Sequence, residues 1–213
     1  MEYTPLEEYG VIGNLETVAL VGSDGAVDWC CFPHVESPSV FARLLDRHRG
    51  GYFSVQPATS FESTQRYVDD TNVLQTEFQT RSGQVTVTDF MPVPAVDGVN
   101  ISSIFRRISC ESGQVELNVE FNPRFDYARI RPTIGTTENG VVATAGDERL
   151  VLSSTIPLIA SPPSVSGSET LSTGDTQWLS LGYGVDVDWR PTDPQPVLDR
   201  VLQYWRNWVS RAT

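Results

Sequence analysis

The sequence contains no lysine, so all 15 of its basic residues are arginines, and 27 acidic residues outnumber them. The formal net charge is -12 at pH 7. A chain without a basic stripe has nothing to displace counterions from phosphates, so we expect no nucleic-acid partner. Two explanations of the missing lysine stay open: adaptation to molar salt, where self-repulsion is screened within about 3 Å, and the codon bias of a GC-rich genome.

Cysteine and histidine are also scarce. Cys30 and Cys31 are adjacent and Cys110 is far away, a spacing that fits neither a disulfide framework nor a zinc site. The two histidines, His34 and His48, make a histidine-dependent catalytic triad improbable, and no Gly-x-Ser-x-Gly motif accompanies them. We therefore expect no metal and no cofactor, and we interpret the cysteines as reduced residues of a cytoplasmic protein.

Long apolar runs are missing as well. No stretch approaches the roughly 20 apolar residues of a membrane-spanning helix. The first eight residues have neither the basic nor the apolar segment of a secretory signal. These absences lead us to expect no membrane association.

What the sequence does contain is a series of short apolar runs separated by glycine turns. Residues 114–121 alternate strictly, with Val115, Leu117, Val119 and Phe121 on one face of a strand. We predict an all-β fold, an antiparallel β-sandwich of the supersandwich type, because no long helices are available for parallel crossovers. The predicted strands cover residues 18–21, 26–32, 73–80, 85–90, 101–110, 114–121, 141–145, 148–154 and 178–185, with a hairpin turn at 112–113.

Three segments depart from this pattern of short strands and glycine turns. Ser37-Pro38 has the form of a helix start, and it predicts a short helix over residues 38–45. The Ser/Pro/Gly-rich residues 161–174 are predicted to form an exposed loop. The C-terminal residues carry apolar side chains at three- and four-residue spacing after a proline-rich lead. We accordingly divide the chain into a sandwich domain, 1–192, and a linker helix, 193–213.

Candidate chemistry is limited to acidic and aromatic residues. Paired carboxylates hydrolyse sugars, and Asp24, Asp28, Glu36 and Asp126 lie close to aromatic residues in the sequence. Each has a second interpretation as a turn former or a surface carboxylate. The five tryptophans could stack on sugar rings or simply pack in the core. The residues alone therefore assign no catalytic side chain.

A series of short motifs gives a more specific indication. They are Ile12-Gly13-Asn14, Asp24-Gly25-Ala26-Val27-Asp28-Trp29, Ser37-Pro38-Ser39-Val40-Phe41-Ala42, Gly50-Gly51, Tyr67, Asp70-Thr71-Asn72, Thr88-Asp89-Phe90-Met91-Pro92 and Pro123-Arg124-Phe125-Asp126-Tyr127. Together, in order and spacing, these motifs resemble the N-terminal domain of glycoside hydrolase family 15, particularly its prokaryotic glucoamylase- and trehalase-like branch. Locally the sequence departs from that family at Cys30 and at Pro33 to Pro38.

The resemblance implies a two-domain enzyme: a sandwich, a linker helix, and an (α/α)6 barrel in which two glutamates invert the anomeric centre of an α-glucoside. We expect this chain to end before that barrel begins, so no catalytic residue is assigned to it. The resemblance implies instead a set of residues that border the substrate pocket or dock on the barrel. They are Asp28, Trp29, His34, Glu36, Arg124, Asp126, Tyr127, Trp205 and Trp208. For Arg124 and Asp126, a salt bridge within the domain is an equal alternative.

Three functional classes follow. The first is a non-catalytic domain whose partner is a family 15 barrel, in the same chain or a separate one. The second is a free-standing carbohydrate-binding sandwich, and the third is an autonomous hydrolase. The sequence leaves three further points open: the choice between starch oligosaccharides and trehalose, the binding of α-glucosides by the isolated chain, and homo-oligomer formation.

Overall fold

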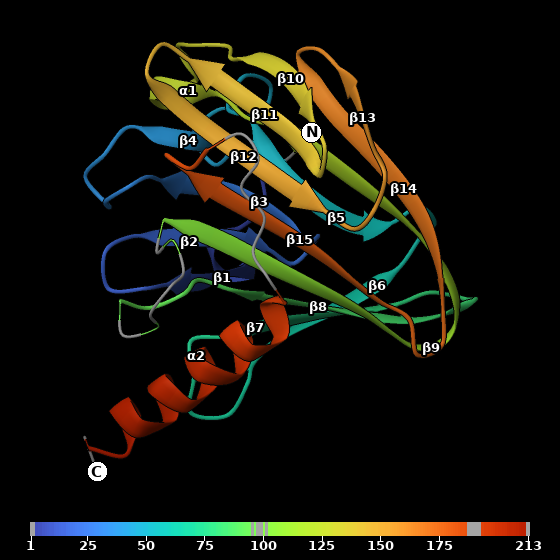
Figure 1. Cartoon of the computed structure of the whole chain (residues 1–213). Coiled ribbons are helices and arrows are strands. Elements are labelled where there is room, and N and C mark those ends of the chain that lie inside the picture. The colour runs from blue at the N-terminus through green and yellow to red at the C-terminus, as the bar shows by residue number, and fades with distance from the viewer. Residues whose placement is uncertain (1–2, 95, 97–99, 101, 187–192, 212–213) are drawn as a thin grey trace.

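The computed structural model describes residues 3–94, 96, 100, 102–186 and 193–211, and it shows two antiparallel sheets joined by one long strand (Figure 1). Sheet A runs in spatial order β1 (Tyr9–Gly13), β2 (Val18–Gly22), β3 (Ala26–Cys31), β5 (Tyr52–Pro57), the second half of β9 (Ser103–Asn122), β14 (Ser164–Ser172) and β13 (Leu158–Ser161), with β4 (Ser39–Ala42) beside β3. Sheet B runs β6 (Glu62–Tyr67), β7 (Leu74–Gln79), β8 (Gly83–Phe90), the first half of β9, β15 (Thr176–Tyr183), β12 (Glu148–Ser154), β11 (Gly140–Ala145) and β10 (Thr133–Thr137). The predicted antiparallel sandwich is confirmed.

The strand β9 was wrongly predicted as a hairpin. Its first half pairs with β8 and β15, and its second half pairs with β5 and β14, so the 20-residue strand passes from one sheet to the other. Gly113, with φ of 71°, lies where the pairing changes. A glycine in a strand marks a bend as readily as a turn. Here both halves of the strand find partners elsewhere, so the chain bends without reversing.

The core between the sheets follows the alternation of the sequence. Val115, Leu117, Val119 and Phe121 are at most 1% exposed. Phe121 meets the rings of Phe41 and Phe53 edge-on, at centroid distances of 6.1 and 5.8 Å. Period-two burial on facing strands is what a sandwich requires, because each sheet buries one face.

The short helix predicted over residues 38–45 is wrong, because Ser39–Ala42 forms strand β4. All four residues are buried, and Phe41 pairs with Cys30 of β3. Burial on a sheet edge therefore outweighed the local helix signal.

The predicted loop over residues 161–174 is wrong as well. Ser164–Ser172 is strand β14, which pairs with β9 along eight residues. Val165 and Leu171 are each 1% exposed and point to the core, while serines occupy much of the other face. The serine-rich composition concealed a half-buried strand.

The predicted C-terminal helix is confirmed as α2, Pro194–Val209. Asp193 caps it by accepting a hydrogen bond from the Gln195 amide at 3.3 Å. Its buried side chains pack on Phe90 and Phe105 of sheet B to form a second apolar cluster: Val197, Leu198, Val201 and Trp205. Figure 1 shows the C-terminal part of the helix running out beyond the sheets. Residues 187–192, where we placed the domain boundary, lie outside the described residues.

Several of the sequence motifs prove to be scaffold contacts. Asn14 Oδ1 accepts hydrogen bonds from the amides of Glu16 and Thr17, which shapes the β1–β2 turn. Asn72 Oδ1 accepts from the Gly13 amide at 2.5 Å, and Tyr67 exchanges two hydrogen bonds with the backbone of Val11. The motifs thus tie sheet B to the edge of sheet A.

A buried ion pair within sheet B holds the arginine that links the two layers. Arg106 of β9 and Asp89 of β8 are both 0% exposed, and Nε donates to Oδ1 at 2.7 Å while Nη2 donates to Oδ2 at 3.1 Å. The same guanidinium donates to the carbonyls of Phe53 at 3.0 Å and Gly25 at 2.7 Å, both in sheet A or its turns. This arginine therefore links sheet B to sheet A through the core.

Within the described residues, all three cysteines are free and buried. No described helix is long and apolar enough to cross a membrane.

Candidate functional site

Asp28 lies in a buried polar network on β3. It is 2% exposed; Arg43 Nε donates to Oδ1 at 2.5 Å, and the Tyr9 hydroxyl donates to Oδ2 at 2.7 Å. Burial raises the pKa of the Asp28 carboxyl, and the charge of Arg43 opposes that shift. Burial and Asp28 likewise raise the pKa of Tyr9. Because both carboxylate oxygens of Asp28 have partners inside the domain, Asp28 serves to hold Tyr9 and Arg43 in place.

Arg43 extends the network across the sheet. Its Nη2 lies 3.0 Å from Asp24 Oδ2, and its guanidinium sits 4.4 Å from the centre of the Tyr52 ring. The Tyr52 hydroxyl donates to Glu120, and burial together with that carboxylate raises the pKa of Tyr52 to about 12. Arg43 was not selected from the sequence, and a sequence pattern offers no signal for it, because none of its three side-chain partners, Asp24, Asp28 and Tyr52, is adjacent to it in the sequence.

Trp29 and Tyr127 meet at the end of the sandwich. Their ring centroids are 6.3 Å apart, and the Tyr127 hydroxyl donates to the Ser37 carbonyl at 3.5 Å. Tyr127 lies in α1 (Phe125–Ala128), which is a left-handed turn: Asp126, Tyr127 and Ala128 have φ of 49°, 53° and 66°. Left-handed backbone costs a residue with a side chain about 1–2 kcal/mol. Such strain concentrates at functional positions, and here it presents Tyr127 at the surface, 40% exposed.

The salt bridge between Arg124 and Asp126, which was the alternative to a docking role for these residues, is not formed. Asp126 pairs instead with Arg129, Oδ1 to Nη1, at 3.3 Å. Arg124 donates from Nη1 to the carbonyls of Pro123 at 2.7 Å and Pro163 at 3.5 Å. Burial and the nearby Arg131 lower the pKa of the Arg124 guanidinium. Arg124 is thus a buried cation held by carbonyls.

Close to this turn, Glu148 of β12 and Tyr183 of β15 are ionisable groups that the sequence did not single out. Burial, followed by the charge of Asp126, raises the pKa of Glu148. Burial, followed by Glu148, raises the pKa of Tyr183, whose ring stacks on Phe32 at 5.8 Å. Glu148 and Tyr183 therefore connect the end of sheet B to the loops of sheet A.

The remaining candidates are more dispersed. His34 Nδ1 lies 3.2 Å from Glu16 Oε2 at the surface, and Glu36 is exposed nearby. Trp205 is 8% exposed in the α2 cluster, and its buried Nε1 has no hydrogen-bond partner among the described residues. Trp208 contacts Trp205 at 6.0 Å and remains 52% exposed. The structure brings Trp29, Arg124, Asp126 and Tyr127 to one end, and leaves the two α2 tryptophans apart from them.

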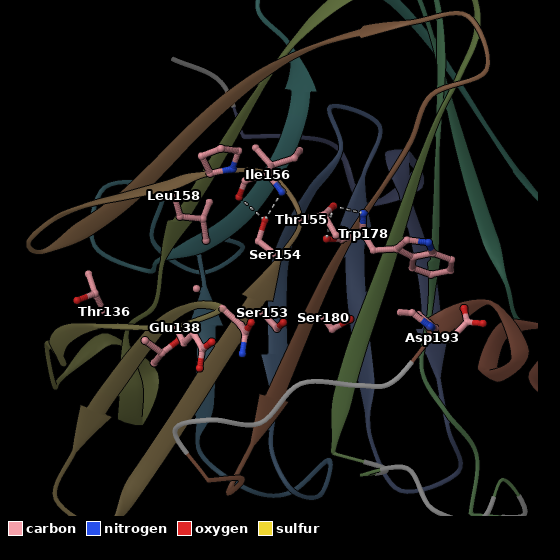
Figure 2. Close-up of a pocket in the computed structure, with 15 residues that line it drawn as sticks. Thr136, Glu138, Ser153, Ser154, Thr155, Ile156, Leu158, Trp178, Ser180 and Asp193 are labelled. Carbon is pink, nitrogen blue, oxygen red and sulfur yellow. Dashed lines mark hydrogen bonds between the residues drawn. The ribbon is translucent and has the colours of Figure 1, made fainter.

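A groove of about 970 Å³ lies on sheet B. Figure 2 shows Ser153 and Ser180 on the neighbouring strands β12 and β15, with Glu138 on one side and Asp193 on the other. Trp178 also lines it, and its amide is held by the Thr155 hydroxyl at 2.9 Å. Hydroxyl and carboxylate groups beside an indole suit a polyhydroxylated ligand.

In the described part of the chain, no group of three or more His, Cys, Asp or Glu residues could hold a metal ion. Two of the acidic candidates, Asp28 and Asp126, are engaged in ion pairs with Arg43 and Arg129. These two carboxylates therefore hold segments of the domain in place.

Comparison of the sequence with known proteins identifies the relatives of this chain. The family model described as trehalase-like, N-terminal, matches residues 1–157. The trehalase of Thermoplasma volcanium is 31% identical, covering 99% of this chain and 35% of that protein. The trehalase of Thermoplasma acidophilum is 32% identical, covering 91% of this chain and 34% of the relative, and that of Mycolicibacterium smegmatis is 26% identical, covering 98% and 35%.

The chain therefore spans about a third of the length of these curated relatives. The match of the family model extends from β1 through β12 and so covers most strands of both sheets. On this evidence the chain belongs to the trehalase-like N-terminal domain family.

Proposed function

We propose that this chain serves as the non-catalytic N-terminal domain of a family 15 α-glucoside hydrolase, and that the loop end of its sandwich docks on the catalytic barrel. The observation that carries the proposal is the match to trehalases over 99% of this chain but 35% of the relative. The remaining length in such a relative has room for a catalytic domain. The relatives are named trehalases, which favours trehalose as the substrate of the whole enzyme.

The docking surface that we propose, the loop face, consists of Leu15, Val35, Tyr127 and Ile130. Their exposed fractions are 61%, 56%, 40% and 45%. They come from separate loops that are linked by hydrogen bonds, including Val35 amide to Glu16 carbonyl at 3.0 Å. Exposed apolar side chains on loops that are held together by hydrogen bonds support the assignment of an interface.

Catalysis in this proposal belongs to the barrel. Inversion at an anomeric centre uses a carboxylic acid and a carboxylate about 6.5–9.5 Å apart, and the family resemblance assigns both to barrel glutamates. The task of the sandwich is then to hold the barrel and to border its pocket with Trp29 and Tyr127.

The proposal predicts that the purified chain releases no glucose from trehalose or maltose. A chimera in which this chain replaces the aligned 35% of the Thermoplasma volcanium trehalase should hydrolyse trehalose, because the docked barrel is then complete. Val35→Asp in the loop face should weaken that activity at least about tenfold, as expected when a charge is buried at an interface. Glucose release is measured by a coupled assay.

Ile159→Asp is the matched control, since Ile159 is 66% exposed on β13, outside the loop face. It should leave the chimera active. Turnover of trehalose by the 213-residue chain alone would overturn the proposal. A folded chimera that is no more active than the barrel by itself would overturn the docking role.

The groove on sheet B supports a second candidate, a carbohydrate-binding sandwich. Titration calorimetry of the chain with maltose, trehalose and maltotriose should then give saturable heat at millimolar sugar. Glu138→Ala should abolish this heat, because the exposed carboxylate lines the groove. Trp208→Ala, a change outside the groove, should leave it unchanged. Absence of heat for all three sugars would eliminate this candidate.

A further inference from the structure

Two arginines are placed opposite each other by an isolated β-bridge at the left-handed turn. Phe125 and Ile130 form the bridge, with the Phe125 amide donating at 2.9 Å and the Ile130 amide at 3.1 Å. In an antiparallel bridge the next pair outward is Arg124 and Arg131. Like charges directly opposite each other are destabilising, so this pair calls for a compensating anion.

Arg124 is held firmly in place. It is 7% exposed, its amide donates to the Val40 carbonyl at 2.9 Å, and its stem lies against Gly51, where an added Cβ would come within 2.8 Å of Arg124 Cγ. Nη1 is occupied by the carbonyls of Pro123 and Pro163. In the described part of the chain nothing accepts a hydrogen bond from Nε or Nη2, the edge of a guanidinium that binds a carboxylate with two parallel bonds.

No acid neutralises the pair within the described residues. Asp126, the acidic residue of the turn, is engaged by Arg129. Arg131 is exposed and forms no ion pair with a described residue. The lowered pKa of Arg124, caused by burial and then by Arg131, agrees with an uncompensated cation. In a chain with 27 acidic and 15 basic residues, two facing arginines without a carboxylate are unexpected on charge statistics alone.

We propose that Arg124 and Arg131 form a binding site for a carboxylate, with the Nε and Nη2 edge of Arg124 as the fixed donor and exposed Arg131 as the second. The ligand is an aspartate or glutamate side chain on a partner polypeptide. Tyr127 and Ile130, 40% and 45% exposed, flank the site and would contact apolar atoms around that side chain. The site is a property of this chain, whereas this source of the carboxylate rests on the docking function proposed above.

The first test titrates the labelled 213-residue chain with sodium acetate and follows the arginine Nε–Hε resonances by NMR. Acetate should shift the signals of Arg124 and Arg131 saturably in the millimolar range, against a chloride titration at equal ionic strength. Arg81 and Arg66, which are exposed elsewhere, should follow the chloride control. Arg131→Gln should abolish the saturable shift. Sulfate that saturates the site where acetate does not would overturn the assignment to a carboxylate.

The second test supplies the carboxylate within the chain. Arg131→Glu should raise the melting temperature, because the new side chain faces Arg124. Arg81→Glu, with the same charge change in an already acidic protein, should lower it or leave it unchanged. Equal effects of the two variants, or no acetate shift at Arg124, would overturn the site. If acetate binds and the chimera of the docking test fails, the site stands and the partner is wrong.

Discussion

Asp89→Ala is expected to lower the free energy of unfolding by about 3–5 kcal/mol. The variant leaves the guanidinium of Arg106 buried at 0% exposure without the carboxylate that it binds through two hydrogen bonds. The two remaining carbonyl acceptors, on Phe53 and Gly25, do not neutralise its charge. Urea denaturation followed by tryptophan fluorescence measures the loss.

The double variant Asp89→Leu with Arg106→Met is the control. It removes both charges and refills the space with apolar atoms, so it should recover most of the stability, as replacements of buried ion pairs often do. A loss below about 1 kcal/mol for Asp89→Ala, the size of an ordinary substitution, would show that the buried pair does not stabilise the fold.

Gly25→Ala should have an effect of similar size, on the order of 4 kcal/mol, a loss that is diagnostic of a specific structural defect. Gly25 has φ of 79°, and a Cβ there would lie 2.3 Å from the Val55 carbonyl oxygen and 2.8 Å from Phe78 Cζ. Its own carbonyl accepts a hydrogen bond from Arg106. The substitution therefore adds backbone strain, a clash with another backbone and displacement of the arginine. Thermal and urea denaturation measure the change.

Gly146→Ala separates these contributions. Gly146 also has a positive φ, 61°, but nothing lies within 4 Å of a Cβ placed there. The Gly146→Ala variant should lose only the free energy of placing a side-chain-bearing residue in a left-handed backbone, about 1 kcal/mol. Equal losses of unfolding free energy for the two variants would mean that the close approach of residue 25 to Val55 does not contribute to the effect.

The strand alternation was the most informative signal in the sequence. It located the second half of β9, where alternate residues such as Leu117 are 0% exposed, although the hairpin turn placed in the middle of that strand was wrong. Apolar runs bounded by glycine turns located β12 and β15, whose central residues are buried on both faces. Where that signal was masked, prediction failed. β4 is buried along its whole length and does not alternate, and β14 places serine between its buried residues. Both strands owe their structure to partners distant in the sequence.

The candidate site was predictable only in part. The motif around Asp28 was recognised, and the structure shows what it does: the carboxylate binds Arg43 and Tyr9. Neither partner could be inferred, because each lies in a different segment and the contact exists only in the folded chain. The left-handed turn at Asp126 was equally hidden, since non-glycine residues rarely adopt that backbone and the sequence carries no glycine there.

The course of β9 limits how this domain can come apart. Its first half is the partner of β8 and β15, and its second half is the partner of β5 and β14. Neither layer has a complete set of neighbours until the same strand is in place, so the two layers cannot melt separately. The sandwich therefore behaves as a single cooperative unit. Cleavage of the chain at Gly113 would remove the direct covalent connection that β9 makes between the two layers.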